Sequence, residues 1–191
     1  MRRKDREMSE EYGLSVIDRA EYGTLSIIDY TEPKLPYAIP LSIARIEHKL
    51  YFHSAKSGHK TELLKDGARA RVVFVDKVRV PDFFDQQELV QIAEAGEIGK
   101  QLSKIFTTEF SSAIVTGIVR QISATKEFPE YESAMRAICE KYVPDKMILF
   151  EAALEMSLER MAVYAIEIDS IKAKRKKFDA QNEEMKWQRM E

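Results

Sequence analysis

Residues 110–123 constrain the fold of this chain more than any other segment, because two kinds of side chain alternate along them. Successive side chains of a β-strand point to opposite faces, so this pattern predicts one long strand. One face carries Phe110, Ser112, Ile114, Thr116, Ile118 and Ile122, and the other carries Ala113, Val115, Gly117 and Val119. A glycine inside a strand indicates a bulge or a close approach of another segment at that point.

The remaining segments place this strand in an antiparallel sheet. Further strands are predicted at residues 24–30, 37–44, 50–54, 70–75 and 161–168, and helices at residues 9–23, 59–65, 81–106, 125–143 and 145–160. This order lacks the regular alternation of strand and helix that builds parallel sheets. The sequence therefore predicts an α+β fold whose mainly antiparallel sheet can close on itself.

Capping residues indicate where the helices begin and end. Ser9 and Asp145 are suited to cap the helices that follow them, and Gly23 and Gly67 to end the helices that precede them. In the first helix three apolar residues are predicted to face inward: Leu14, Val16 and Ile17. In the helix at 125–143 an apolar stripe predicts a core-facing side: Phe128, Tyr131, Met135, Ile138 and Tyr142.

Residues 81–106 interrupt the series of strands. Five apolar residues have helical spacing, and Gly96 and Gly99 follow soon after: Phe83, Phe84, Leu89, Ile92 and Ala93. We interpret the segment as a helical insertion that serves as a lid or a dimer contact. It lies inside a predicted domain of residues 1–168.

Residues 169–191 are predicted to form a charged tail. It contains a basic run, an acidic pair and the only tryptophan, namely Lys172, Lys174, Arg175, Lys176, Lys177, Glu183, Glu184 and Trp187. A basic run is most often a solvated face, and here no aromatic residues are interleaved to stack on bases, so nucleic-acid binding is not expected. A lone aromatic such as Trp187 often docks on a partner surface.

Composition narrows the class of protein. The chain has 191 residues, of which 45% are hydrophobic and 32% charged, with a net charge of −2, values typical of a soluble globular domain. The single cysteine, Cys139, excludes an internal disulfide and fits a reducing compartment. We expect no secretory signal, because no apolar region follows MRRKDREM, and no membrane span, so the expected location is cytoplasmic.

The stretch at residues 36–60 looks like half of a binding cradle. In its first strand a face of large residues (Tyr37, Ile39, Leu41, Ile43) alternates with a face of small ones (Ala38, Pro40, Ser42, Ala44). Small residues leave room for a flat ligand, and Pro40 favours an edge or a bulge. An ordinary core strand with an edge proline explains the pattern equally well.

The second half of this stretch predicts an anion site. Gly58 allows a sharp turn, and the helix after it directs free N–H groups outward beside the charge of Lys60. The nucleotide-binding glycine motifs, the zinc motifs and the hydrolase motifs are absent, and three histidines with one cysteine support no protein-built metal site. Any chemistry would most simply come from a bound cofactor.

Four segments together resemble the 5-nitroimidazole-resistance proteins within the pyridoxamine 5′-phosphate oxidase-like flavoproteins: MRRKDREM, PYAIPLSIA, LYFHSAKSGHKTELL and SSAIVTGIV. The resemblance covers residues 1–168 and implies a split β-barrel, an obligate homodimer and FMN bound in a groove at the dimer interface. No metal is implied.

The resemblance also implies roles for individual residues. The strand at Ile39, Pro40, Leu41 and Ser42 would run along the flavin and bind it through main-chain groups. His53 and Ser54 match the family motif beside the flavin ring and ribityl chain, and His53 is the implied catalytic residue. Lys60, with His59 as a helper, would bind the phosphate. Ser111 and Ser112 would approach from the other subunit.

The implied activity is an FMN-dependent oxidoreductase that passes electrons from a reduced nicotinamide to a small, possibly nitroaromatic, acceptor. Two alternatives stay open: a module that binds or senses flavin without turnover, and oxidation of pyridoxamine 5′-phosphate, for which no matching substrate-binding motif is assigned.

Overall fold

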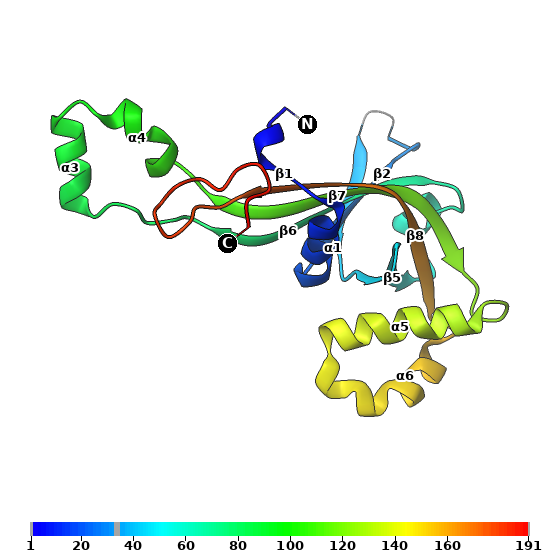
Figure 1. Cartoon of the computed structure of the whole chain (residues 1–191). Coiled ribbons are helices and arrows are strands. Elements are labelled where there is room, and N and C mark those ends of the chain that lie inside the picture. Colours follow the sequence, from blue (N-terminus) through cyan, green and yellow to red (C-terminus); the bar gives the residue numbers. More distant parts are fainter. Residues whose placement is uncertain (1, 33–34, 191) are drawn as a thin grey trace.

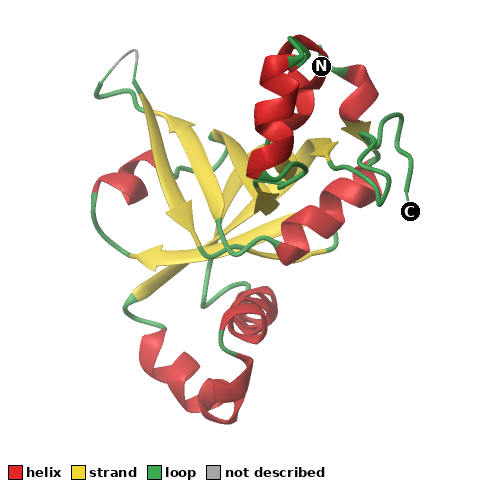
Figure 2. Cartoon of the chain, turned by 90° about the vertical axis from the view of Figure 1, so that its left-hand side faces the viewer, coloured by secondary structure: helices red, strands yellow, loops and turns green. Residues whose placement is uncertain are grey.

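The computed structural model describes residues 2–32 and 35–190, and within these ranges eight strands form one antiparallel sheet. The strands are β1 (Glu7–Met8), β2 (Gly23–Ile28), β3 (Pro36–Leu41), β4 (Ala44–Ile46), β5 (Lys49–Ala55), β6 (Arg69–Arg79), β7 (Glu109–Ile122) and β8 (Met161–Lys176). They follow the order β3-β2-β6-β7-β8-β5-β4, with β1 paired to β8. The fold is α+β, a split β-barrel, as predicted (Figures 1 and 2).

Helices lie around this sheet: α1 (Glu10–Arg19), α2 (His59–Leu63), α3 (Gln86–Glu94), α4 (Ile98–Ile105), α5 (Phe128–Tyr142) and α6 (Phe150–Ser157), with short 3-10 turns at Lys4–Arg6 and Pro144–Leu149. The pair α5 and α6 lies below one end of the sheet, whereas α3 and α4 project from the opposite end (Figure 1). The predicted insertion is therefore helical, and none of the residues in α3 or α4 is buried.

Two apolar clusters hold the elements together. The first fills the barrel and packs α1 against it, with Leu25, Phe52, Val72 and Phe74 fully buried. The second lies on the outer face of β5 and β8 and is covered by α5 and α6; it includes Tyr131, Met135 and Ile138 of the predicted helical stripe. Strands β5 and β8 therefore bury both of their faces where α5 and α6 cover them.

Gly117 lies where β7 and β8 change register. Thr116 pairs with Ser170, but Gly117 pairs with Ile168, so Asp169 is the extra residue of a β-bulge. A Cβ atom on Gly117 would overlap the carbonyl oxygen of Glu167 and lie 2.7 Å from Cγ2 of Ile166. Both expectations for this glycine, a bulge and a close approach, are confirmed.

Gly117→Ala is expected to lower the free energy of unfolding by about 1–3 kcal/mol, because an added methyl group must displace backbone as well as side chain. Gly99→Ala is the matched control. It lies inside α4, where an added Cβ meets no atom within 4 Å, and alanine is the better helix former there. Chemical denaturation of both variants checks the contrast, and equal stabilities would contradict it.

Several predicted element boundaries are wrong. Helix α1 is capped by Ser9 as predicted, but it ends at Arg19. Gly23 instead begins β2, where a Cβ would lie 2.7 Å from the ring of Phe74. The strand predicted to run to residue 30 ends at Ile28. Asp145 caps no α-helix, since a 3-10 turn precedes α6.

The largest of these differences concerns the C-terminal part of the chain. Strand β8 does not stop at Ile168 but continues to Lys176, so the basic run of the expected tail is paired along β7. A 16-residue strand needs a long partner, and β7 supplies it. The bulge at Asp169 shifts the alternation of side chains by one residue, so the sequence pattern did not indicate that the strand continues beyond Ile168.

Candidate functional site

The end of β5 and the start of α2 bring four of the predicted site residues together. His53 is exposed on the outer face of β5, and its pKa is lowered by desolvation and by the nearby charge of Lys60. Ser54 is buried on the opposite face, where its hydroxyl donates to the carbonyl of Ala55 at 2.8 Å. The two residues of the HisSer pair thus point to opposite sides, as the two-residue period of a strand requires.

Lys60 supplies an uncompensated charge at this corner. Its side chain is half-buried, and desolvation lowers the pKa of its ammonium group. No carboxylate or other hydrogen-bond acceptor among the described residues pairs with that ammonium group. Gly58 adopts φ 111°, and the space where its side chain would lie is open to 4 Å. The corner therefore presents a cation beside an open surface.

His59 is held by Asp29, a residue that the sequence did not single out. Nε2 of His59 lies 2.6 Å from Oδ2 of Asp29, while Oδ1 of Asp29 accepts from the N–H and hydroxyl of Thr31. Hydrogen bonds from Thr31 and His59 lower the pKa of Asp29, and the bond to Asp29 raises the pKa of His59. The Tyr37 ring meets the imidazole edge-on, with centroids 5.5 Å apart.

Asp29→Asn is expected to return the pKa of His59 toward its ordinary value of 6.5. The raised pKa means that the pair stabilises the fold below pH 6.5 and that this contribution is lost as the pH rises through the pKa of folded His59. The lowered pKa of Asp29 means that the stability contributed by the pair is also lost in acid, below about pH 4. An NMR titration of His59 measures the shift. Glu62→Gln keeps Asp29 and removes only the smaller contribution of Glu62 to the raised pKa of His59, so it is expected to lower that pKa less.

Strand β3 lies at one end of the sheet, and within the described ranges it pairs only with β2. Pro40 therefore occupies an edge strand, as predicted. Ile39 and Leu41 pack inward against the barrel core, while Ala38 and Pro40 are exposed. The outer side of β3 combines small side chains with main-chain groups that no neighbouring strand uses.

Ser111 and Ser112 lie far from this corner within one chain. His53 is in register with Val163 of β8, which is in register with Ile122 of β7. Ten strand residues separate Ile122 from Ser112, a distance of roughly 33 Å. Ser111 is buried, with its hydroxyl 2.6 Å from the hydroxyl of Tyr12. The predicted site residues thus form two groups at opposite ends of β7.

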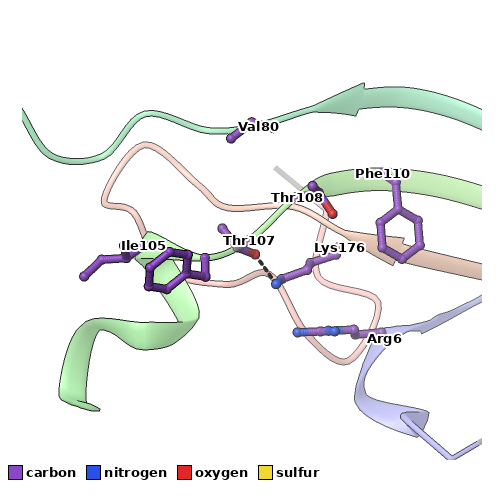
Figure 3. Close-up of a pocket in the computed structure, with 8 residues that line it drawn as sticks. Arg6, Val80, Ile105, Thr107, Thr108, Phe110 and Lys176 are labelled. Atoms are coloured by element: carbon purple, nitrogen blue, oxygen red, sulfur yellow. Dashed lines mark hydrogen bonds between the residues drawn. The ribbon is translucent and has the colours of Figure 1, made fainter. Parts of the chain in front are cut away.

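Two hollows lie beside the second group. One, of about 550 Å³, is lined on one side by Val80 and Ile105 and on the other by Arg6 and Lys176. Figure 3 shows the Lys176 side chain reaching across it to the hydroxyl of Thr107. The second, of about 920 Å³, lies between α1 and the ends of β7 and β8. Across residues 2–32 and 35–190, no three potential ligands gather as a metal cluster, and no helix is long and apolar enough to span a membrane.

The sequence contained only part of the information that would have identified Asp29 as a residue of this site. Asp29 is followed by Thr31 in a turn, and an aspartate that accepts a bond two residues on is a familiar turn element. Its bond to His59 joins residues 30 positions apart, and no local pattern indicates such a pair.

The chain is thus a small antiparallel split barrel in which, among the described residues, an exposed histidine and a lysine without an acidic partner lie at one corner. Residues 9–175 match the family model described as pyridoxamine 5′-phosphate oxidase, and the chain belongs to this family. A search of curated protein sequences gave no match.

Solved structures share the fold at low sequence identity. A candidate 5-nitroimidazole antibiotic resistance protein from Bacteroides thetaiotaomicron is 16% identical, with a TM-score of 0.59 over 87% of this chain and 83% of that one. The FAD and heme binding protein from Mycobacterium smegmatis is 16% identical, with a TM-score of 0.62 over 90% and 73%. An FAD-binding protein from Mesorhizobium loti is 15% identical, with a TM-score of 0.55 over 89% and 96%. At these identities the likeness shows the fold alone.

Proposed function

We propose that this protein binds FMN at the corner of β5 and α2 and acts as a flavin-dependent oxidoreductase. The observation that carries the proposal is Lys60, a half-buried ammonium with no acidic partner among the described residues, set beside exposed His53. A phosphate would supply the missing anion. The family match and the flavin named for two of the structural neighbours support a flavin as the ligand.

The residues of this corner fit the parts of such a ligand. Lys60 would hold the phosphate, with His59 beside it kept cationic to a higher pH by Asp29. The open edge of β3 at Ile39, Pro40 and Leu41, with Ser42 directly after the strand, would supply main-chain hydrogen bonds along a flat ring, over the small side chains of Ala38 and Pro40. When bound, the flavin supplies the redox chemistry, transferring electrons between a donor and an acceptor.

His53 is proposed as the residue that meets the acceptor. Its lowered pKa keeps the imidazole neutral at pH 7, so one ring nitrogen can donate a hydrogen bond to the acceptor while the other accepts. We propose a reduced nicotinamide as the electron donor and a small molecule, with nitroaromatic compounds in the class, as the acceptor. A cytoplasmic location agrees with the single cysteine.

We also propose that the protein is a homodimer whose two chains complete each flavin site. The outer face of β2, β6 and β7 carries exposed apolar side chains, namely Ile28 at 58%, Val75 at 47%, Ile114 at 37% and Ile118 at 37%. A second copy on this face would cover them. It would also bring the partner's Ser112, which lies on the same face of β7 as Ile114, toward the corner that its own chain leaves about 33 Å away, whereas Ser111 faces α1 inside its own chain.

The decisive experiment is the absorbance spectrum of the purified protein before and after addition of FMN and a reduced nicotinamide under anaerobic conditions. Flavin absorbance that is bleached by the nicotinamide is the expected result. If flavin binds but is never bleached, the protein is a module that binds or senses flavin without turnover. Absence of flavin binding would overturn the proposal, and turnover of pyridoxamine 5′-phosphate would redirect it to that oxidase activity.

A further inference from the structure

The 920 Å³ cavity at the end of β7 and β8 contains a buried cation for which the described residues supply no carboxylate. Arg175 is only 5% exposed, and its Nε–H has no hydrogen-bond partner among the described residues. Nη1 contacts only the thioether sulfur of Met190, at 3.3 Å, and Nη2 donates to the carbonyl of Arg189. A buried guanidinium without a counter-charge is costly, so this arrangement calls for an anion.

The acidic residues of this cavity are already engaged. Glu109 accepts from Arg79 and, at 2.8 Å, from the N–H of Phe178. Asp179 accepts from Arg189 and from two main-chain N–H groups. Neither carboxylate bonds to Arg175, and the lining adds further cations, of which Lys77 is exposed.

The positions of the two strands explain why Arg175 lies inward. Arg175 is in register with Ser111, and both side chains face α1, where the guanidinium lies over the Tyr12 ring at 5.6 Å. Lys174 points to the other face of β8, where its ammonium lies 5.3 Å from the centre of the Phe110 ring. The basic run predicted as a solvated tail therefore contributes one residue to a cavity wall, and the segment at Arg189 and Met190 covers it from outside.

We propose that this cavity binds a small molecule through an anionic group, a phosphate or a carboxylate, that accepts the Nε–H of Arg175. A bidentate or charge-assisted bond to a guanidinium is the geometry that both groups favour. Lys77 lies at the rim and adds long-range attraction. Within one chain this cavity and the corner of Lys60 and His53 lie at opposite ends of β7, so variants at Arg175 and at Lys60 test the two sites separately.

Calorimetric titration of the flavin-free full-length protein with inorganic phosphate, and separately with acetate, tests this proposal at constant ionic strength set with chloride. Saturable binding of one of the two anions is expected, and the anion that binds identifies the group.

Arg175→Met is expected to weaken the binding of that anion at least roughly tenfold. Lys77→Met, which changes an exposed residue and should leave the fold intact, is expected to weaken it several-fold. Lys174→Met removes the same charge from the other face of β8 and should leave binding unchanged.

Three results would overturn the proposal. One is no saturable binding of either anion up to about 10 mM. Another is equal binding by the wild type and Arg175→Met. The third is a loss of FMN affinity in Arg175→Met as large as in a Lys60 variant, which would assign the cavity to the cofactor. Failure of FMN to bind at all would leave the anion titration unaffected.

Discussion

Ile114→Arg is expected to convert the proposed dimer to a monomer and to lower the affinity for FMN at the same time. Ile114 lies on the outer face of β7, next to Val73 of β6 in register, and is 37% exposed. On a dimer interface each substitution enters twice, so two guanidinium groups would lose water without a partner. Each costs several kcal/mol in a buried setting, so the two together would remove a large share of the roughly 8–16 kcal/mol of net binding energy that a standard interface retains.

Sedimentation and flavin titration of the same samples measure the two effects together. Ile148→Arg is the matched control: Ile148 is 92% exposed on the 3-10 turn before α6 and lies off the sheet face. It should leave both the mass and the FMN affinity unchanged. A monomeric Ile114→Arg that binds FMN as tightly as the wild type would show that one chain holds the cofactor alone, and a dimeric one would place the interface elsewhere.

The regular parts of the fold were predictable because local patterns determine them. The alternation in residues 110–123 corresponds to β7, and the stripe from Phe128 to Tyr142 corresponds to α5, buried against the second cluster. Gly58 has positive φ, as its place before a short helix predicted. Gly117 marks a bulge, which is one of the two things an interior glycine can mean.

The parts that failed depend on contacts between distant residues. Residues 37–44 were predicted as one strand, but the chain leaves β3 after Leu41 and starts β4 at Ala44, so β5 pairs with β4 and β8 and not with β3. A break of two residues leaves no mark in an alternating pattern. Arg175 faces inward because of its register with Ser111. His59 is held by Asp29, which lies in the turn after β2. Neither contact has a signal in the local sequence.

The candidate site was predictable to a similar degree. The resemblance placed His53 and Lys60 in one site, and the structure brings them to one corner with coupled charges. Ser54 entered the prediction as a neighbour of His53 in sequence, yet its hydroxyl is used by the Ala55 carbonyl inside the barrel. Adjacent residues of a strand face opposite ways, so a motif written along the chain combines residues that touch a ligand with residues that support the strand.

Lys60→Ala is expected to weaken FMN binding by about 1.5–3 kcal/mol, or roughly 10- to 150-fold, because it removes a charge-assisted bond to the phosphate. Lys60 is the second residue of α2, where alanine preserves the helix, so the loss reports the charge. Fluorescence titration with FMN and with riboflavin, which lacks the phosphate, separates the two contributions.

Only FMN should lose affinity in this variant, since riboflavin offers Lys60 nothing to pair with. Lys56→Ala is the control, because Lys56 is an exposed cation in the turn just before α2. An equal loss in both lysine variants would mean that the general positive field attracts the phosphate. An equal loss for riboflavin and FMN would mean that Lys60 supports the ring end of the site, and unchanged FMN affinity would move the phosphate to another part of the surface.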